Sequence, residues 1–459
     1  MIMNYKINKI LLLVSILIFG CDNWIEGYDN DPNSSQDVTM DNLLTASQVN
    51  VFGFSQNHLA RTVAIWMQQM TGTDRQYKSL GLYSFEENDY SSSWQSVYIN
   101  GGLKDLRKIQ SMADNQGPKS LRYKAIAQIL ESYLIGMAAS IWGRIPYSEA
   151  LDESIKNPKL DSQDQVYLEV QNLLDEAIIN LASDTTLIPQ NDMFFNGDIE
   201  KWKAVAYTLK ARYYMHWVES DESNCVAALE NANKGISSLE GTLKSLHGTE
   251  SSEQNMWNQF EQDRSGYMVA GAKLINLLDG NNDPRLNIYF GENEAGSIVG
   301  ANPNETPQGK SYLNDEFYGI DAPIDIISYE ENLLIKAECN YILGNHNQAL
   351  TMLQNSQLAS ETKWGISIPD ITSSNNLWNN ILEEKYITMF LNIEIWNDYK
   401  RNCFPEVKYK KSEDDDGNPI YEYPPLRVYY PEDERITNTS IPSIFDQPVK
   451  NQNDTNSCE

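Results

Sequence analysis

The chain has 459 residues, of which 41% are hydrophobic and 10% aromatic, enough to bury a large core in one domain or in two to three ordinary ones. Its formal net charge is −29, from 64 acidic and 35 basic residues. Such a negative field argues against nucleic acid and other polyanions as partners, because they would be repelled, and it suits neutral ligands such as sugars, or basic ones.

The first 20 residues are typical of a signal peptide that ends at a lipidated cysteine. Met1–Lys9 carries two lysines and no acid, and Ile10–Phe19 is an almost wholly apolar run of about ten residues. A bilayer span needs about 20 such residues, so this segment is too short to be a transmembrane helix and indicates export. Cys21 stands where a bacterial lipoprotein carries its lipid, although Phe19 departs from the small residue usual there. We therefore predict residues 1–20 as a lipoprotein signal peptide and Cys21 as the lipidation site; the alternative is an ordinary signal peptide beside a chance cysteine.

Residues 21–41 are predicted to form a flexible tether that follows the lipid. This segment is rich in Asp, Asn, Ser and Pro, a composition that favours solvated chain over a packed core. Acyl chains anchor a protein to a membrane by burying CH₂ groups, at about 0.8 kcal/mol each. We expect a membrane-held protein whose body, residues 42–459, is soluble.

Helical periodicity dominates the body. Apolar residues recur three or four positions apart in residues 121–141, 165–182, 202–217, 226–239, 333–353 and 382–396. Each such helix must bury its apolar stripe against a neighbour. The join around Gly344 resembles the turn of a tetratricopeptide (TPR) repeat, although no regular 34-residue period is present. The sequence predicts a mainly α fold with TPR-like helical hairpins and a few short strands.

Long stretches between these helices are rich in Gly, Asn, Asp, Pro and Tyr. They cover residues 71–93, 241–328 and 403–459. Irregular segments of this length are usually functional or disordered, and 26 tyrosines argue against disorder because disordered chains lack aromatic residues. We expect ordered loops that bind a ligand.

The sequence contains no motif that indicates catalysis, a cofactor or a metal site. The four histidines form no HExxH motif, and GxSxG, GxGxxG and P-loop motifs are absent. His216 is expected to be a packed or surface residue, and the acidic run Asp414–Asn418 fails the spacing of an EF-hand and is expected to be a solvated turn. Cys225 and Cys339 are expected to be buried small hydrophobes. The pairing of the four cysteines that follow Cys21 stays open: Cys225, Cys339, Cys403 and Cys458.

Several short segments occur together in a fixed order along the chain. The sharpest is Trp142–Leu151, with the sequence WGRIPYSEAL. The others are Asn30–Asn33 with Leu43–Ala46, Gly197–Arg212, Asp283–Leu286 (DPRL), Ser328–Glu338, Trp396–Arg401 and Arg427–Asn438. In this order they resemble the SusD/RagB family of nutrient-binding outer-membrane lipoproteins of Bacteroidetes, and they cover most of residues 22–440.

This resemblance implies a function for the exported body. A SusD-like lipoprotein would capture an oligosaccharide outside the cell and pass it to a SusC-like TonB-dependent outer-membrane barrel, its protein partner, without making or breaking a bond. It implies an outer-membrane, lipid-anchored and surface-exposed location, to which the acidic Asp22 after the lipidated cysteine conforms. Three alternatives stay open: the same role with a peptide as ligand, an exported glycosidase, and a structural TPR adaptor.

Ligand-binding residues are sought among aromatic side chains outside the core stripes, because sugar CH faces stack on rings while Arg and amide groups bond the hydroxyls. We predict a platform of Arg75, Tyr77, Trp94, Trp257 and Tyr318 in the loop regions. Trp257 has polar neighbours, which favours exposure. Trp94 lies at the start of a predicted helix, where binding a ligand and packing in the core are equally consistent with the sequence. Tryptophans at helical spacing are assigned to the core: Trp66, Trp202, Trp217, Trp378 and Trp396.

Overall fold

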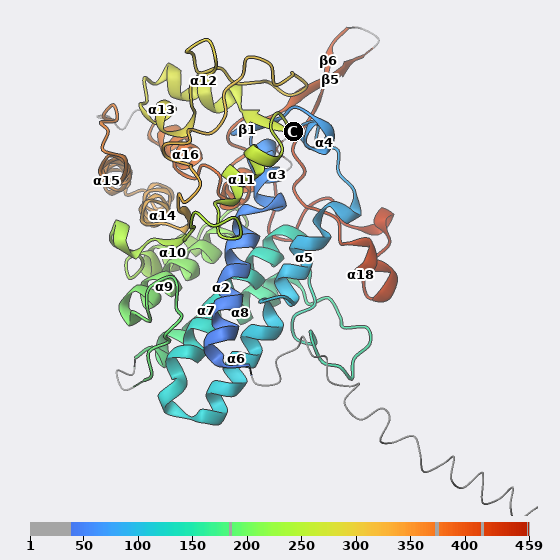
Figure 1. Ribbon diagram of the computed structural model, residues 1–459, viewed down its shortest axis with the longest axis vertical. Helices are drawn as coiled ribbons and strands as arrows, with labels where there is room; N and C mark the ends of the chain where they lie inside the picture. Colours follow the sequence, from blue (N-terminus) through green and yellow to red (C-terminus); the bar gives the residue numbers. More distant parts are fainter. Residues whose placement is uncertain (1–37, 183–185, 372–375, 415–416, 457, 459) are drawn as a thin grey trace, which may run out of the picture. The chain divides into compact units, whose positions relative to one another are not determined.

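The computed structural model describes residues 38–182, 186–371, 376–414, 417–456 and 458. Residues 40–459 form one compact unit. The predicted signal peptide, the lipidation site Cys21, Asp22 and nearly all of the tether lie outside the described residues. Figure 1 shows the arrangement of the helices and strands of residues 40–459.

Helices make up most of the described chain, which confirms the mainly α prediction. The α-helices are α2 (Met40–Gln56), α3 (His58–Trp66), α4 (Arg75–Gly81), α5 (Ser91–Tyr98), α6 (Leu103–Gln116), α7 (Leu121–Trp142), α8 (Gln163–Asn180), α9 (Ile199–Met215), α10 (Asn224–Ala232), α11 (Met256–Asp263), α12 (Ala272–Gly280), α13 (Arg285–Tyr289), α14 (Tyr329–Ile342), α15 (His346–Trp364), α16 (Leu377–Thr388), α17 (Glu394–Asn402) and α18 (Glu432–Thr437). Short 3-10 turns are η1 (Glu87–Tyr90), η2 (Pro118–Ser120), η3 (Leu239–Gly241) and η4 (Ile444–Asp446).

The strands are short and form three separate antiparallel pairs. They are β1 (Met70–Gly72), β2 (Leu243–Ser245), β3 (Met268–Ala270), β4 (Ile324–Ile327), β5 (Tyr409–Glu413) and β6 (Pro419–Glu422). Strand β1 pairs with β3, β2 with β4, and β5 with β6. Each pair connects a loop segment either to the helical scaffold or to another loop segment. The β5–β6 hairpin projects from the other elements in Figure 1.

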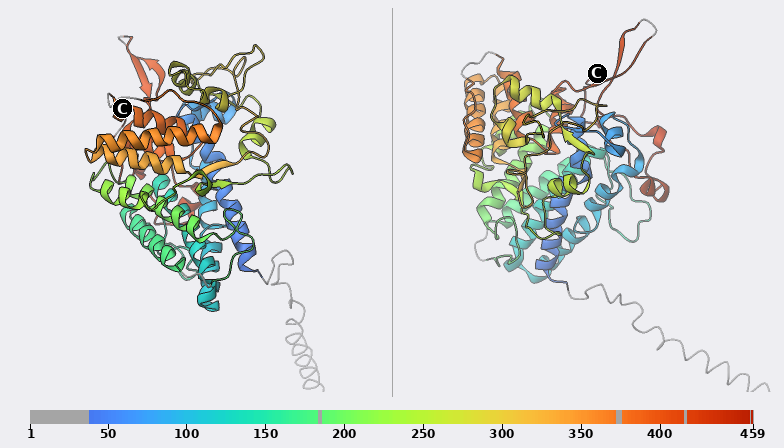
Figure 2. Two further views of the ribbon diagram at one scale, coloured as in Figure 1. Left: turned by 90° about the vertical axis from the view of Figure 1, so that its left-hand side faces the viewer. Right: turned by 45° about the horizontal axis from the view of Figure 1, so that its top comes forward.

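Consecutive helices pack as hairpins, as the sequence predicts. The pairs are α7 with α8, α9 with α10, and α14 with α15, and α10 also packs on α14 (Figure 2). Buried apolar side chains of α9, α10 and α14 form one cluster, which includes Met215, Cys225 and Cys339. Gly344 has φ +81°, a left-handed conformation that a glycine adopts without steric cost, so the chain reverses between α14 and α15.

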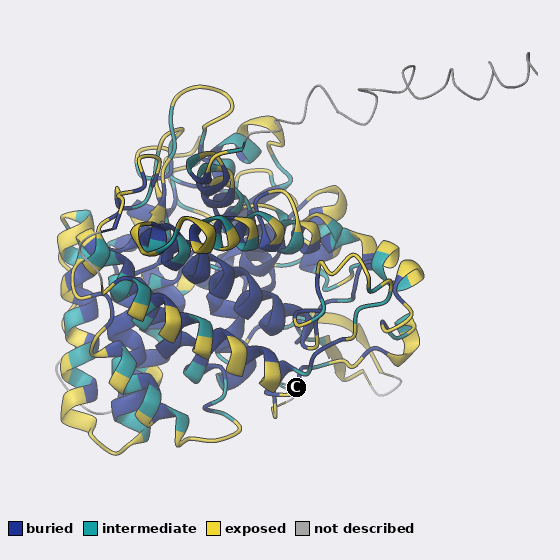
Figure 3. Cartoon of the chain, turned by 90° about the horizontal axis from the view of Figure 1, so that it is seen from below, coloured by how far each residue is buried: buried dark blue, intermediate teal, exposed yellow. Residues whose placement is uncertain are grey.

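Helix α7 is the centre of the core. It is long and apolar enough to cross a membrane by length and composition, but its apolar window is wholly buried among the other helices. The dark blue helices in the middle of Figure 3 show this buried layer. A helix that is apolar on all sides is typical of the interior of a large soluble domain, so α7 is a core helix.

Side chains and a backbone N–H from distant segments satisfy the last carbonyl groups of α7. The Ser140 carbonyl accepts hydrogen bonds from Lys400 Nζ and Asn451 Nδ2, both at 2.7 Å. The Trp142 carbonyl accepts one from Arg427 Nε at 2.9 Å, and the Ile141 carbonyl accepts one from the Val428 N–H at 3.4 Å. The last carbonyls of a helix lack partners within it and carry partial negative charge, which cations stabilise. The C-terminal segment therefore caps the central helix.

The structure differs from the predicted helix limits at two places. The apolar stripe of residues 382–396 is divided into α16 and α17, because Leu391 takes a left-handed φ of +63° that no helix contains. The stripe of residues 226–239 gives a helix only as far as Ala232. The stretch 241–328 is more regular than expected, with helices α11 to α13 among its loops.

The cysteine pairing that the sequence left open is decided by the fold. Cys403 and Cys458 form a disulfide, which joins the end of α17 to the C-terminal tail. Cys225 and Cys339 are free and buried, as predicted. The disulfide holds the segment that caps α7.

His216 belongs to a buried polar network, in line with the packed role predicted for it. Its Nδ1 lies 2.6 Å from the Tyr167 hydroxyl and its Nε2 lies 2.7 Å from Glu394 Oε1. Arg212 forms a two-point ion pair with Glu331, at 2.5 and 2.6 Å. Burial by itself would raise the pKa of Glu394, but His216 and Arg212 lower it to about 2. These side chains link several helices to one another and are buried.

Candidate functional site

An open groove lined by aromatic side chains lies in the C-terminal part of the unit. Its walls come from residues 83–85, residues 421–429 and residues 444–450, and its volume is about 800 Å³. Its aromatic members are Tyr83, Phe85, Tyr421, Tyr423, Tyr429 and Phe445. This set of walls is called the aromatic groove below. Its volume lies within the ~300–1,000 Å³ range of small-molecule sites.

The first wall follows helix α4 and is fixed by a glutamine. Gln68 Nε2 donates to the Tyr83 hydroxyl at 3.2 Å and to the Lys408 carbonyl at 3.3 Å, so it joins the first wall to the segment before β5. Phe85 packs on Tyr429 of the second wall, with ring centroids 5.1 Å apart. The two walls therefore hold each other through side-chain contacts.

The second wall begins on strand β6. Tyr421 pairs in register with Lys410 of β5 and is 39% exposed. The ammonium group of Lys408 lies 4.6 Å from the centre of the Tyr421 ring, a cation–π contact that orients this ring. Pro424 and Pro425 follow Tyr423 and restrict the backbone there. A ring held in this way loses little conformational entropy when a ligand stacks on it.

The third wall is anchored by a buried glutamate. Glu87 forms a two-point ion pair with Arg435, at 2.7 and 2.8 Å, and accepts a hydrogen bond from Gln447 Nε2 at 3.4 Å. Gln447 in turn accepts from the Tyr430 N–H at 3.0 Å. Phe445 lies beyond this anchor and is 95% exposed. The wall thus combines a fixed base with a freely accessible ring.

The ionisable residues of the aromatic groove have partners within the protein. Glu422 is paired with Lys411, Lys450 Nζ donates to the Thr455 carbonyl at 2.8 Å, and Arg427 caps α7. Glu422 is balanced by Lys411, whereas Lys450 and Arg427 donate to neutral oxygens, so the groove presents rings, amides and carbonyls together with two positive groups. Such a surface suits a neutral ligand with CH faces and hydroxyl groups.

Four of the five predicted platform residues are buried, and three of these are packed in the scaffold. Trp257 is 0% exposed and lies on the buried face of α11, whose N-terminus is capped by the Asn255 side chain. Trp94 is 2% exposed and packs edge-on against Trp142, with centroids 5.1 Å apart. Tyr77 is 2% exposed and its hydroxyl accepts from Arg61 Nε at 3.0 Å. Stacking on a sugar needs an exposed ring face, and these three rings provide none in this conformation.

The other two predicted residues are placed differently, and the five do not form one platform. The Arg75 side chain is 68% exposed and lies beside Asp74 at 3.9 Å, with its guanidinium 5.7 Å from the Tyr267 ring. Tyr318 is 7% exposed and lies 6.3 Å from Trp364, centroid to centroid, at a separate hollow. Arg75 and Tyr318 stay predictions as ligand contacts.

The aromatic groove was not identified residue by residue from the sequence. Its walls lie mostly within 403–459, one of the stretches predicted to be ordered binding loops. The dense Tyr and Pro residues of 421–431 are a usable indication, since rings and restricted backbone favour a fixed surface. The exposure of each ring depends on contacts with Gln68, Lys408 and Glu87, which no local pattern specifies.

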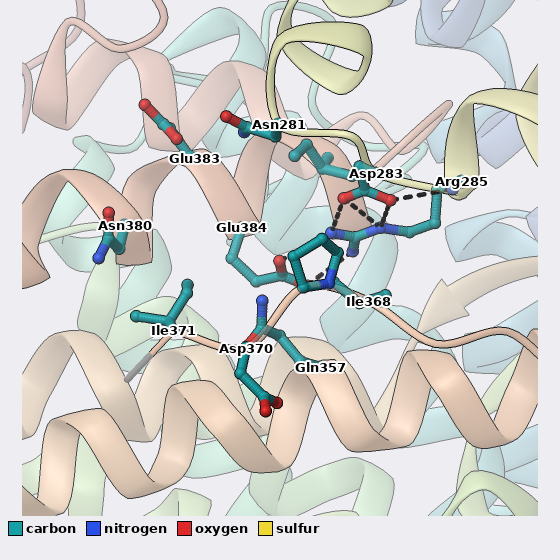
Figure 4. Close-up of a pocket in the computed structure, with 12 residues that line it drawn as sticks. Asn281, Asp283, Arg285, Gln357, Ile368, Asp370, Ile371, Asn380, Glu383 and Glu384 are labelled. Atoms are coloured by element: carbon teal, nitrogen blue, oxygen red, sulfur yellow. Dashed lines mark hydrogen bonds and ion pairs between the residues drawn. The ribbon is translucent and has the colours of Figure 1, made fainter. Parts of the chain in front are cut away.

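A smaller polar hollow, of about 230 Å³, surrounds the DPRL turn (Figure 4). Arg285 is buried and forms ion pairs with Asp283 and Glu384, at 2.6 and 2.7 Å. Figure 4 shows Glu383 and Asn380 apart from this ion-paired group. The carboxylates nearest Arg285 are occupied, so the turn has a structural role. Within the described ranges, no group of three or more His, Cys, Asp or Glu side chains could hold a metal ion.

Solved structures with the same fold come from the SusD group. A chitin-binding SusD homologue from Flavobacterium johnsoniae superimposes with a TM-score of 0.74 at 17% identity, covering 90% of this chain and 99% of its own. A SusD/RagB family protein from Bacteroides thetaiotaomicron has a TM-score of 0.65 at 21% identity, covering 79% and 87%. A further chitin-binding protein has a TM-score of 0.72 at 21% identity, covering 91% and 100%. These likenesses confirm the predicted SusD-like fold.

No curated protein matches the chain in sequence. A family model does match, over residues 32–431, and its description is "Starch-binding associating with outer membrane". This range contains the WGRIPYSEAL segment, the DPRL turn and most of the aromatic groove. The protein therefore belongs to the SusD-like family, a family of starch-binding proteins that associate with the outer membrane.

Proposed function

We propose that this protein captures a neutral oligosaccharide at the aromatic groove. The observation that carries the proposal is the gathering of six aromatic rings in one open hollow of about 800 Å³. Pyranose rings stack their CH faces on aromatic rings, and the backbone carbonyls of the walls are suited to hydroxyl groups. The family description and the chitin-binding neighbours support a glycan as the ligand class.

The proposal includes anchoring and delivery. A lipid on Cys21 would hold the protein on the outer membrane, exposed at the cell surface, and the captured glycan would pass to a SusC-like TonB-dependent barrel. The signal-peptide pattern and the family's association with the outer membrane support this part. The protein would act by binding alone, with catalysis left to other proteins.

Affinity electrophoresis and calorimetry of the purified protein test the capture step. The panel holds neutral polysaccharides (starch, chitin oligosaccharides, xylan), acidic polysaccharides and unfolded peptides. We expect saturable binding to at least one neutral glycan. We expect Tyr421→Ala and Phe445→Ala each to weaken it by up to about tenfold, the loss of one stacking contact.

Tyr207→Ala is the matched control, since Tyr207 is a partly exposed tyrosine of α9 outside the groove. This variant should bind like the unaltered protein. Binding of peptides in place of glycans would overturn the ligand class. Glycan binding that survives the two groove substitutions together would overturn the site.

A further inference from the structure

We propose that a second hollow, here called the Trp364 pocket, binds a single neutral sugar ring. It lies between the end of α15, strand β4 and the segment before β4, and its volume is about 260 Å³. The residues that carry the argument are Tyr289, Tyr318, Asp325, Glu330, Lys363 and Trp364. None of its lining residues belongs to the aromatic groove.

One side of the Trp364 pocket is aromatic. Tyr289 and Phe390 are stacked, with centroids 4.4 Å apart and planes 15° apart. Tyr318 stands edge-on to Phe390 at 5.6 Å and is tilted by 40° to Trp364 at 6.3 Å. Trp364 is only partly buried, so part of its ring is open to the hollow and to solvent. The Lys363 ammonium group lies 4.9 Å from the centre of the Trp364 ring, so a sugar CH face would stack on the part of the ring that this contact leaves open.

The other side of the pocket is polar and incompletely satisfied. Lys363 Nζ lies 2.5 Å from Asp325 Oδ2 and 3.4 Å from Glu330 Oε1. Glu330 is 1% exposed, and among the described residues its Oε2 has no hydrogen-bond partner. A buried carboxylate oxygen without a donor costs free energy. A ligand hydroxyl in the pocket would supply the missing donor.

The charges of the pocket indicate a neutral ligand. Among the lining residues, the carboxylates of Asp325 and Glu330 are matched in number by the ammonium groups of Lys363 and Lys244, and Lys363 lies within ion-pair distance of both carboxylates. A charged ligand would disturb this balance. Charged side chains that face hydroxyl groups act as strong hydrogen-bond partners, roughly twice as strong as neutral ones, so a polyol ring gains from the same residues.

The size of the hollow limits the ligand further. A volume of about 260 Å³ is below the ~300–1,000 Å³ of sites for drug-sized molecules. It admits one ring and excludes a chain of several. The pocket would therefore bind a free monosaccharide or one terminal residue of a longer glycan.

Isothermal calorimetry and intrinsic tryptophan fluorescence with D-glucose, D-galactose, N-acetyl-D-glucosamine and D-mannose test this inference. We expect saturable binding of at least one of them and a change of fluorescence, because Trp364 lies at the site. Trp364→Ala and the isosteric Glu330→Gln should each weaken binding by about tenfold or more. Thermal unfolding of each variant establishes that it is folded.

The same titrations of Tyr421→Ala separate this inference from the proposed function. Monosaccharide binding unchanged in that variant supports a second site, whereas its loss would assign the sugar to the aromatic groove and overturn the inference. Binding of none of the four sugars would overturn it, as would binding that withstands Trp364→Ala. Binding of D-glucosamine or ethylamine alone would overturn the neutral ligand class.

Discussion

Tyr421 and Trp257 illustrate how exposure decides the role of an aromatic residue. Both stand in polar stretches of the sequence, and Trp257 has the more polar neighbours. Tyr421 lies on an edge hairpin and is 39% exposed, whereas Trp257 lies on the inner face of α11 and is 0% exposed. A short helix buries one face whatever the average polarity of its residues. The ring in the more polar context is therefore a core residue.

Trp257→Ala is expected to destabilise the fold by about 3–5 kcal/mol, the usual cost of removing a buried large aromatic side chain. Chemical unfolding followed by circular dichroism measures this change. Tyr421→Ala, at an exposed position, is the control and should change stability by less than about 0.5 kcal/mol. A Trp257→Ala protein of unaltered stability with reduced glycan binding would restore this tryptophan to the ligand site.

Glu261 is a buried carboxyl group that makes stability depend on pH. It is 8% exposed, and its Oε1 accepts one hydrogen bond, from the Leu313 N–H at 3.3 Å. Burial, helped by the charge of Asp315, raises the pKa of Glu261 from 4.5 to about 8. In the unfolded chain the group ionises near pH 4.5, so between these values the folded state binds more protons than the unfolded state. The free energy of unfolding must then fall as pH rises from about 4.5 to 8.

Glu261→Gln is expected to reduce this fall, because glutamine cannot ionise and still accepts the bond from Leu313. Denaturant unfolding between pH 5 and pH 9 measures the free energy of unfolding. The free energy of the variant should exceed that of the unaltered protein most at the upper end of this range. Glu253→Gln, at an exposed position, controls for the lost charge. Parallel pH profiles for the Glu261 variant and the unaltered protein would contradict a raised pKa of Glu261 in the folded protein.

At the scale of elements, the C-terminal segment both caps the core and builds the groove. The disulfide between Cys403 and Cys458 joins residues 55 positions apart. The β5–β6 hairpin, residues 421–429 and residues 444–450 all lie within this closed loop. A two-stranded hairpin is marginally stable by itself, so the groove depends on the attachment of both ends of the loop.

Cys458→Ser should lower the free energy of unfolding by roughly 4 kcal/mol, the loop-closure value for a ring of this length. Differential scanning calorimetry with and without dithiothreitol measures it. Reductant should bring the unaltered protein to the stability of the variant and leave the variant unchanged. Equal stability of both proteins without reductant would contradict a structural role of the bond.

At the scale of the whole molecule, the net charge of −29 repels negatively charged ligands. Stacking of a neutral glycan on the rings of the aromatic groove involves no charge on the ligand that salt could screen. A polyanionic glycan would meet repulsion that salt screens, since the Debye length falls from ~30 Å at 0.01 M to ~3 Å at 1 M.

The dissociation constant for a neutral glycan should therefore change less than about twofold between ~0.01 and ~1 M salt. Calorimetric titrations at several sodium chloride concentrations check this. Heparin serves as the polyanionic comparison and should not bind at the lowest concentration. A steep loss of neutral-glycan affinity with salt would indicate that charges, and not rings, carry the binding.

The sequence by itself determined the helical scaffold and the family resemblance. Apolar periodicity placed α7, α8, α9, α14 and α15, because each helix must bury a stripe and the stripe is written locally. Gly344 marked the TPR-like turn for the same reason, since its left-handed φ is a property of one residue. Trp66, Trp202 and Trp396 were placed in the core by their helical spacing and are 0% exposed, whereas Trp217 and Trp378, placed there on the same ground, are only partly buried.

Only the tertiary structure decided which rings face solvent, which cysteines pair and where the stripe of residues 382–396 breaks. Each depends on residues far apart in the chain: Gln68 reaches Lys408, Glu87 reaches Arg435, Cys403 reaches Cys458, and Gln69 accepts a hydrogen bond from the Leu391 N–H at the break. Local sequence patterns do not specify such partners, because the free energy that fixes these side chains comes from contacts that exist only after folding. The scaffold was therefore readable from the sequence, whereas the candidate binding surfaces were not.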